Sequence, residues 1–311
     1  MKTRRLAPDT AGIEEAAALL RQGLLVSFPT ETVYGLGADA RNGTAVARVF
    51  EAKGRPSFNP LIVHVADAAQ ARTYVKWSDV AEVLASAFWP GPLTLALPLK
   101  EGHGLSGLVT AGLDTVAIRV PAHPSAQALL RSFDGPVAAP SANPSGKISA
   151  TTADHVLAGL DGKIAAVLDD GPCPVGLEST IVGLSGPGPV LLRAGGLPQE
   201  AIELVLGQPL GQITGSDITA PGQLTSHYAP GATVRLRATE RQPGEVMLGF
   251  GAVDGDLNLS KAGDLTEAAA NLFEFLHQLD ARHRPIAVAP IPDTGLGRAI
   301  NDRLNRAAAP R

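Results

Sequence analysis

The stretch LLVSFPTETVYGLG, residues 24–37, joins a β-strand pattern to a polar turn and indicates an α/β fold. Its apolar beginning predicts a buried strand over residues 24–28. Polar residues follow at 30–32, where this strand ends, and a Gly-containing loop follows at 35–37. Loops at strand ends often hold ligands, so we expect a site here. A tight turn whose threonines satisfy local backbone groups is an equally good interpretation.

Short runs rich in Val, Ile and Leu recur along the chain and predict further strands. They lie at residues 61–65, 93–97, 116–120, 165–168, 180–184 and 190–192. Helical patterns lie between them, among them residues 44–52, which end at Gly54 as a natural C-cap. Because helices and strands mix without strict alternation, we expect a mixed, twisted sheet with flanking helices.

A polar, Gly- and Pro-rich stretch at residues 207–231 predicts a linker between two domains. The elements expected after it are strands at 245–250 and 285–291 and helices at 264–283 and 298–307. This order predicts a small, Rossmann-like α/β domain with parallel strands. We therefore expect a catalytic domain at 1–206 and a C-terminal domain at 232–311.

Composition excludes several classes of protein. Lys and Arg number 26 against 30 Asp and Glu, so the formal charge of −4 offers no general attraction for nucleic acid. Aromatic residues make up only 4%, which argues against a stacking platform for single strands. The one cysteine, Cys173, forms no internal disulfide and matches no zinc spacing. Apolar runs are too short to cross a membrane, and we expect a cytoplasmic protein.

The segment KGRPSFNP, residues 53–60, places two cations around a glycine and contains two prolines. A loop stiffened in this way can present fixed charge to a phosphate or carboxylate. A basic helix C-terminus that complements the helix dipole is the alternative. The helix-dipole interpretation accounts for Lys53 but not for the stiff loop, so we favour an anion site. His64 alone suggests a core histidine, but beside this loop it becomes a candidate substrate contact.

A second polar loop, PSANPSGKIS at residues 140–149, offers hydroxyls, an amide and backbone N–H groups that can surround a phosphate. It is not a Walker A loop, because Ile148 follows Gly-Lys. A double turn, Asn-Pro followed by Ser-Gly, remains the alternative. Motifs of metalloproteases, thiol redox proteins and serine hydrolases are absent from the sequence.

Two arginines, Arg119 and Arg193, lie within or at the end of predicted apolar strands. A buried guanidinium is costly unless it is paired, so each needs an acidic partner or an anionic ligand. An internal carboxylate such as Glu178 and an anionic ligand are equally good interpretations for either one.

Taken together, four motifs resemble the YrdC-like threonylcarbamoyl-adenylate synthases. They are FPTETVYGLG at 28–37, KGRP with NPLIVH at 53–64, PSAN with SG at 140–146, and ESTIV at 178–182. The segment APGQLTSHYAP, residues 220–230, resembles the linker of the family's long, two-domain version. Each motif is weak alone, but their joint order is specific.

The resemblance implies synthesis of L-threonylcarbamoyl-adenylate from L-threonine, bicarbonate and ATP, with release of pyrophosphate. The product would serve a downstream tRNA threonylcarbamoyl transferase, and a weak contact with tRNA itself is a further expectation. Positioning and charge stabilisation carry such chemistry, so no dedicated catalytic nucleophile is required. Mg²⁺ is expected with the ATP, held by phosphate oxygens and water and not by an assigned protein site.

The resemblance also implies a set of binding residues. L-threonine would be held by Thr32, His64, Arg119 and Thr180, with Arg119 at its carboxylate. ATP would be held by Lys53, Arg55, Asn59, Thr110, Ser141, Asn143, Ser149, Arg193 and Tyr228. Of these, Lys53 and Arg55 would contact the phosphates, and Tyr228 would cover the site.

Two other functions compete with this one. An RNA-binding module of similar fold is disfavoured by the net charge and the few aromatics. A sugar-phosphate enzyme of the butanone-phosphate synthase type would need an acidic metal site, and the motifs offer mainly Glu31 and Glu178.

Overall fold

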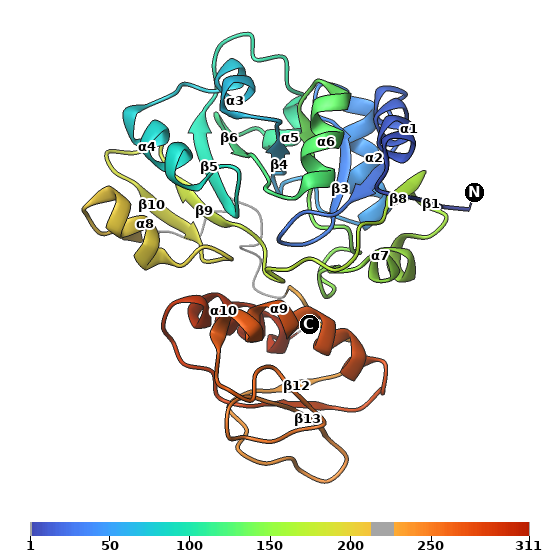
Figure 1. Cartoon of the computed structure of the whole chain (residues 1–311), viewed down its shortest axis with the longest axis vertical. Helices are drawn as coiled ribbons and strands as arrows, with labels where there is room; N and C mark the ends of the chain where they lie inside the picture. The colour runs from blue at the N-terminus through green and yellow to red at the C-terminus, as the bar shows by residue number, and fades with distance from the viewer. Residues whose placement is uncertain (1, 213–226, 311) are drawn as a thin grey trace.

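The computed structural model describes residues 2–212 and 227–310, whose strands form two separate sheets (Figure 1). The larger sheet holds β1 (Arg4–Leu6), β2 (Val26–Phe28), β3 (Gly35–Asp39), β4 (Ile62–His64), β5 (Leu93–Pro98), β6 (Thr115–Arg119), β7 (Val137–Ala138), β8 (Ala166–Leu168), β9 (Thr180–Gly183), β10 (Val190–Arg193) and β11 (Gly211–Gln212). Their order across the sheet is β1-β8-β2-β3-β7-β4-β6-β5-β9-β10-β11. The sheet contains parallel pairs, such as β4 with β6, and antiparallel pairs, such as β5 with β6, which confirms the mixed sheet.

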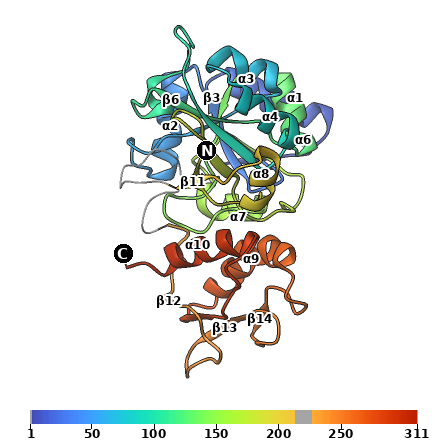
Figure 2. The same ribbon diagram turned by 90° about the vertical axis from the view of Figure 1, so that its left-hand side faces the viewer.

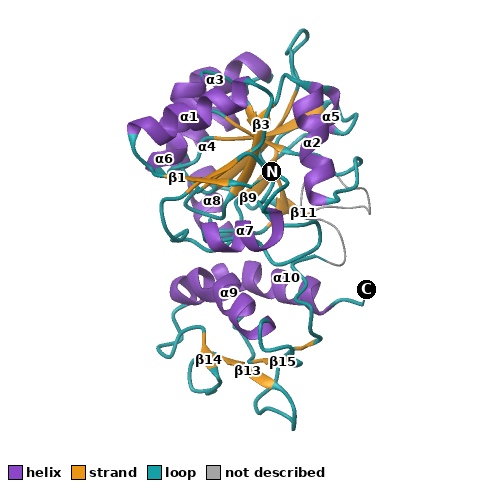
Figure 3. Cartoon of the chain, turned by 90° about the vertical axis from the view of Figure 1, so that its right-hand side faces the viewer, coloured by secondary structure: helices purple, strands orange, loops and turns teal. Residues whose placement is uncertain are grey.

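Helices cover this sheet on two faces. We call residues 2–212 the N-terminal part. Its described helices are α1 (Thr10–Arg21), α2 (Gly43–Lys53), α3 (Ala68–Tyr74), α4 (Asp79–Phe88), α5 (Gly107–Thr110), α6 (Pro124–Phe133), α7 (Ala153–Leu160) and α8 (Gln199–Leu206). Figure 2 and Figure 3 show α1 and α6 on one face and α2 on the other, where Figure 3 also shows α5. The helices α1 and α6 bury Leu20 and Leu129 against Phe28 of β2. Helix α2 buries Val49 with Val63 of β4.

Residues 35–39 differ from the expectation of a Gly-containing loop, because they form strand β3. β3 pairs with β2 and β7 in the middle of the sheet. A Cβ on Gly37 would lie 2.9 Å from the Phe28 ring and 3.0 Å from Val137, so only glycine fits there. Glycines weaken a strand pattern in the sequence, which explains why the loop interpretation was wrong.

The segment expected as a linker begins inside the larger sheet. Gly211 and Gln212 form β11, which pairs in parallel with β10. Residues 213–226, which contain most of the linker motif, lie outside the described residues. The motif's last residues, His227 to Pro230, are described.

The C-terminal part contains the four-stranded sheet and two described helices. Its strands are β12 (Val234–Arg235), β13 (Val246–Gly249), β14 (Leu257–Asn258) and β15 (Ile286–Val288), and its helices are α9 (Leu265–Asp280) and α10 (Leu296–Ala308). All its strand pairs are parallel, as predicted. The sequence missed β12 and β14 because two residues are too few to show a pattern. Figure 1 and Figure 3 show α9 and α10 between the small sheet and the N-terminal part.

No helix among residues 2–212 and 227–310 combines the length and apolar character that a membrane crossing requires.

Candidate active site

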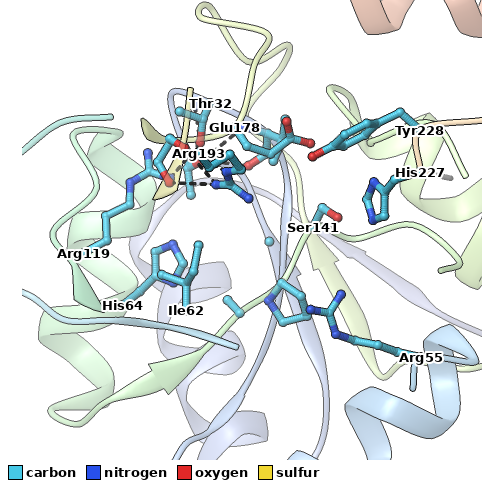
Figure 4. A pocket seen from close by; sticks show the side chains of 16 residues that line it. Thr32, Arg55, Ile62, His64, Arg119, Ser141, Glu178, Arg193, His227 and Tyr228 are labelled. Carbon is cyan, nitrogen blue, oxygen red and sulfur yellow. Dashed lines mark hydrogen bonds between the residues drawn. The ribbon is translucent and has the colours of Figure 1, made fainter. Parts of the chain in front are cut away.

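A pocket opens at the ends of the central strands, on the side that faces the C-terminal part. It is lined by Thr30, Thr32, Val33, Gly35, Arg55, Ile62, His64, Arg119, Ala139, Pro140, Ser141, Glu178, Ser179, Arg193, His227 and Tyr228. Figure 4 shows Arg119 and His64 on one side, Arg55 on another, and His227 with Tyr228 on a third. Of the predicted site residues, the pocket therefore collects Thr32, Arg55, His64, Arg119, Ser141, Arg193 and Tyr228.

Strand pairing brings His64 and Arg119 together. They are register partners at the ends of the parallel strands β4 and β6. The Arg119 guanidinium donates to Thr32 Oγ1 at 2.8 Å and to Glu31 Oε1 at 2.6 Å. The acidic partner of Arg119 is therefore Glu31, and not Glu178. A buried cation at this place suits a carboxylate or phosphate.

His64 is a neutral imidazole in this pocket. Burial, together with the nearby Arg119 cation, lowers the pKa of His64 to about 3. Its Nδ1 has no hydrogen-bond partner within the described part of the chain. A buried ring nitrogen without a protein partner is available to a ligand or water.

Helix α2 delivers the cations Lys53 and Arg55. Asn42 caps its N-terminus, and Gly54 ends it in a left-handed conformation at φ 62°, as the sequence predicts. Lys53 is buried, and its Nζ donates to the backbone carbonyls of Ser141 and Asn143. Lys53 therefore holds the 140–149 loop and does not line the pocket. Its predicted contact with phosphates stays a prediction.

Arg55 turns into the pocket. Its Nη2 donates to the Pro60 carbonyl at 3.0 Å, so the stiff loop also holds the side chain. Burial and the nearby Arg193 lower the pKa of Arg55 to about 10, which leaves it a cation at neutral pH. The loop thus presents a fixed positive charge, as expected for an anion site.

Three other predicted ATP contacts lie beside the pocket lining. Both polar atoms of the buried Asn59 amide lack hydrogen-bond partners among the described residues, and so does Asn143 Oδ1. Ser149 Oγ donates to Glu178 Oε1. Such orphaned buried atoms need a ligand or water. The roles of Asn59, Asn143 and Ser149 in binding ATP stay predictions.

Two predicted threonines use their hydroxyls within the protein. Thr180 Oγ1 donates to the Leu197 carbonyl at 2.6 Å. Thr110 Oγ1 donates to the Gly107 carbonyl at 3.3 Å. Neither residue lines the pocket. Their contacts with threonine and ATP stay predictions as well.

The structure adds Glu178, His227 and Arg303 to the surroundings of the site. Glu178 lines the pocket and accepts from Arg303 Nε at 2.9 Å. Burial alone would raise the pKa of Glu178, but Arg303 and Arg193 outweigh it and hold that pKa below its ordinary value. The sequence carried one clue to Arg303. It lies at helical spacing from Ala299 and Ala307, on the buried face of α10.

Tyr228 lines the pocket, and its predicted contact with ATP stays a prediction; His227 beside it was not predicted. Both side chains are buried. Tyr228 has a left-handed backbone, φ 60°, which is uncommon for a bulky residue. Burial raises the pKa of Tyr228 to about 12, so its hydroxyl stays protonated. Burial lowers the pKa of His227 to about 3, so its imidazole is neutral.

Comparisons with known proteins now decide the family. The family model for Sua5, YciO and YrdC, described as telomere recombination, matches residues 18–195. The model of the threonylcarbamoyl-AMP synthase C-terminal domain matches residues 197–309. The threonylcarbamoyl-AMP synthase of Bacillus subtilis is 44% identical, over 100% of this chain and 99% of its own length. That of Pyrococcus abyssi is 42% identical, over 96% of this chain and 94% of its own length.

The chain belongs to the threonylcarbamoyl-AMP synthase family.

A crystal structure of P. abyssi Sua5 in complex with L-threonine agrees with this assignment. The two structures superpose with a TM-score of 0.91, at 40% sequence identity. The match covers 99% of this chain and 98% of the P. abyssi chain. As a member of the threonylcarbamoyl-AMP synthases, the chain is a nucleotidyltransferase of tRNA modification. One family model matches most of the larger sheet and the other matches the whole four-stranded sheet, and the likeness to P. abyssi Sua5 over 99% of this chain confirms the mixed α/β fold with a C-terminal domain.

Proposed function

We propose that the chain forms L-threonylcarbamoyl-adenylate from L-threonine, bicarbonate and ATP and releases pyrophosphate. The observation that carries this is the full-length similarity to threonylcarbamoyl-AMP synthases, joined to one pocket that collects cations and hydroxyls from four separate motifs. The product supplies the threonylcarbamoyl group for an adenosine next to the anticodon of tRNA.

One end of the pocket suits threonine. The Arg119 guanidinium is fixed by Glu31 and Thr32, which leaves further N–H groups for the carboxylate of the amino acid. The neutral His64 ring, at the end of the neighbouring strand, offers a nitrogen without a charge. Thr32 and Thr180 complete this proposed threonine site. The threonine-bound P. abyssi Sua5 structure supports this choice of substrate.

The other end suits the phosphates of ATP. Arg55, Ser141 and Arg193 line it, and Lys53 is buried behind Ser141. Asn59, Thr110, Asn143, Ser149 and Tyr228 are the remaining proposed contacts with the nucleotide. Cations held in place before the substrate arrives stabilise developing charge without reorganisation, which is the main requirement in phosphoryl and nucleotidyl transfer.

The reaction has two bond-forming steps. The threonine nitrogen forms a C–N bond to the carbon of bicarbonate and loses a proton, and water leaves. An oxygen of this carbamate then attacks the α-phosphorus of ATP, the bond to the β-phosphate oxygen breaks, and pyrophosphate departs. Alignment of three substrates in a closed pocket carries this chemistry.

The pocket also has to open for substrates. Its free space is about 50 Å³, whereas pockets for small molecules typically hold about 300–1,000 Å³. The side chains of His227 and Tyr228 fill one wall. We propose that they move aside to admit ATP and then return to shield the carbamate from water.

Mg²⁺ is proposed to accompany ATP. The residues that the structure describes contain no cluster of three or more His, Cys, Asp or Glu side chains able to hold a metal. Among the described residues, the pocket lining holds one carboxylate, Glu178, which is engaged by Arg303, and the neighbouring Glu31 is engaged by Arg119. This donor set fits an ion bound mainly by phosphate oxygens and water, as Mg²⁺ often is.

The proposed partner after catalysis is the tRNA threonylcarbamoyl transferase machinery, because the mixed anhydride of an adenylate is consumed by acyl transfer to an amine. A weak contact with tRNA is also proposed. A titration with tRNA at physiological salt measures it directly.

The test is release of pyrophosphate by the purified chain with ATP, Mg²⁺, bicarbonate and each amino acid in turn. Mass spectrometry detects the adenylate. We expect release that requires both threonine and bicarbonate. Folded protein that is silent with every amino acid would overturn the proposal, and tight tRNA binding without ATP turnover would favour an RNA-binding module.

A further inference from the structure

The C-terminal part reaches the wall of the pocket through its two helices. Phe273 of α9 lies in one apolar cluster with Val33, Ile148 and Leu177 of the N-terminal part. Val33 lines the pocket, and Leu177 precedes the pocket residue Glu178. The two parts therefore share a packed core directly behind the site.

Arg303 crosses this core with a completely buried side chain. From α10, its Nε donates to Glu178 Oε2 at 2.9 Å, and its Nη1 donates to the Ala194 carbonyl at 2.9 Å. Both acceptors belong to the N-terminal part. Its neighbour Asp302 accepts from the same Nη1 at 2.7 Å. The arginine thus connects the C-terminal helix to Glu178, the carboxylate of the described pocket lining.

The same arginine also supports Tyr228. The Arg303 Cζ lies 5.1 Å from the centre of the Tyr228 ring. On the Phe273 side, the two ring centres lie 5.6 Å apart with planes inclined by 29°. The ring that covers the pocket is therefore held by two side chains of the C-terminal part, one by a cation–π contact and one by stacking.

A guanidinium is a costly choice for this position. The neighbouring buried positions of α10 carry Ala299, Ile300, Leu304 and Ala307, and an apolar residue at 303 would continue that face. Burial of a cation is offset only by good partners, and buried ion pairs add little stability over an apolar replacement. Packing alone therefore gives no reason for an arginine, whereas its contacts with Glu178 and Tyr228 do.

We propose that Arg303 is a positioning residue of the active site, which fixes Glu178 and the Tyr228 ring so that the pocket is complete only when the C-terminal part is docked. The C-terminal part then has a defined task in the reaction. This inference rests on the proposed function for its kinetic test, but its binding test does not.

The kinetic test compares Arg303→Met, Arg303→Lys, Glu178→Gln and the double variant Arg303→Met/Glu178→Gln with the wild type. Threonine-dependent release of pyrophosphate is measured under steady-state conditions. We expect Arg303→Met to lower kcat/KM by about 100-fold, because small displacements of positioning groups have effects of this size. Arg303→Lys keeps the charge and should recover part of the loss.

The division of the loss between kcat and KM separates positioning from a general loss of structure. Arg119 and Thr32 keep their partners in Arg303→Met, so the KM for threonine should change less than kcat. If Arg303 acts partly through Glu178, Arg303→Met should lower kcat/KM less in the Glu178→Gln background than in the wild type, by about the tenfold assigned to its contact with Tyr228. Losses that multiply in the double variant would show independent roles and overturn the proposal.

Arg298→Met is the matched control. Arg298 lies on the same helix and pairs with Glu200 of the N-terminal part at 2.9 Å, but both side chains are partly exposed and neither lines the pocket. Its loss should change kcat/KM by less than about twofold, as for most exposed ion pairs. An equal loss in Arg298→Met and Arg303→Met would mean that docking in general, and not Arg303, supports the site, and this would overturn the proposal.

Folding of the variants is followed by circular dichroism and thermal unfolding. Arg303→Met leaves the Glu178 charge buried without its partner and can fail to fold. The double variant removes both charges and avoids this difficulty. A folded double variant, or a folded Arg303→Met, with wild-type kcat/KM would overturn the proposal.

Calorimetric titration with ATP in the absence of threonine gives a readout that needs no turnover. We expect Arg303→Met to weaken ATP binding by about tenfold through the loosened Tyr228 ring, with Arg298→Met near the wild type. A wild-type chain that binds ATP but forms no adenylate would refute the proposed function and leave this comparison intact. Unchanged ATP affinity in folded Arg303→Met would count against the Tyr228 contact.

Discussion

Arg119, which lines the pocket, forms a buried ion pair with Glu31, with Nη2 2.6 Å from Oε1 and side chains only 4% and 9% exposed. Glu31 is also tied to the backbone, since its Oε2 accepts from the Ala122 N–H at 3.0 Å. The carboxylate therefore fixes the direction of the guanidinium before any substrate binds. This explains how an arginine is tolerated inside the sheet while it remains able to bind an anion.

Glu31→Gln should weaken the use of threonine and destabilise the fold. The amide cannot balance the Arg119 charge, so we expect the KM for threonine to rise about tenfold and the free energy of unfolding to fall by about 1–3 kcal/mol. Urea unfolding and steady-state kinetics measure the two effects. Glu15→Gln removes an exposed pair with Arg4 and should cost less than about 1 kcal/mol. Unchanged kinetics in Glu31→Gln would contradict the role given to this pair.

Arg55→Ala should impair the use of ATP and leave the fold intact. Among the described residues, the Arg55 side chain donates hydrogen bonds only to carbonyls of its own loop, so its loss removes the charge without breaking a contact between helices. We expect the KM for ATP to rise about 100-fold, which corresponds to the loss of about two charge-assisted hydrogen bonds. Arg55→Lys should recover part of the affinity. An unchanged ATP response would remove Arg55 from the site.

Tyr228→Ala should lower the yield of adenylate more than it lowers the release of pyrophosphate. Without the ring, water reaches the carbamate and the adenylate, so part of the product is lost. The measurement is the ratio of intact adenylate to pyrophosphate. Tyr228→Phe keeps the ring between Phe273 and Arg303 and should retain a larger share of product than the alanine variant. An alanine variant with the wild-type ratio would refute the covering role.

Two stacked histidines lie at the contact between the two parts, and we expect them to make this contact sensitive to pH. The rings of His155, on α7, and His277, on α9, lie 3.8 Å apart, and His277 Nε2 lies 3.0 Å from the Ser149 carbonyl. Burial and the neighbouring His277 lower the pKa of His155 to about 4, and burial also lowers the pKa of His277. Both rings are therefore neutral at pH 7. The acidic groups that face the pair are Glu274, at 3.3 Å from His155 Nε2, with Asp154 and Asp280 farther away.

Acidification should therefore loosen this contact. The unfolded histidine, with a pKa of 6.5, takes up its proton before the folded one does, so the stabilisation is complete above pH 6.5 and is lost as the pH falls toward 4. The double variant His155→Gln/His277→Gln should show a flatter fall in thermal stability over this range. His283→Asn, at an exposed histidine, is the control. An equal slope in the double variant and the wild type would contradict the prediction.

The sequence by itself determined most of the described strands, three of the helices and the family. Hydrophobic runs predicted the central strands, and Gly54 marked the end of α2, because these features depend on neighbours within one turn or one strand. The four motifs, read together, were enough for the family and contain four of the predicted residues of the pocket lining, while Arg119, Arg193 and Tyr228 came from two further strands and the linker segment. Strand β3 was missed because its glycines remove the pattern that the sheet around it requires.

Only the tertiary structure decided which groups act together. Arg119 and Glu31 are 88 residues apart, and Arg303 and Glu178 are 125 apart, so no local pattern could pair them. The need of a buried guanidinium for a partner can be read from sequence, but the choice among several carboxylates depends on strand order and on how the two parts dock. The same reason explains why the support of Tyr228 by Arg303 and Phe273 appeared only in three dimensions. The sequence around each residue determines the chemistry of its side chain, whereas the packing of α9 and α10 against the N-terminal part determines that Arg303 and Phe273 contact the Tyr228 ring.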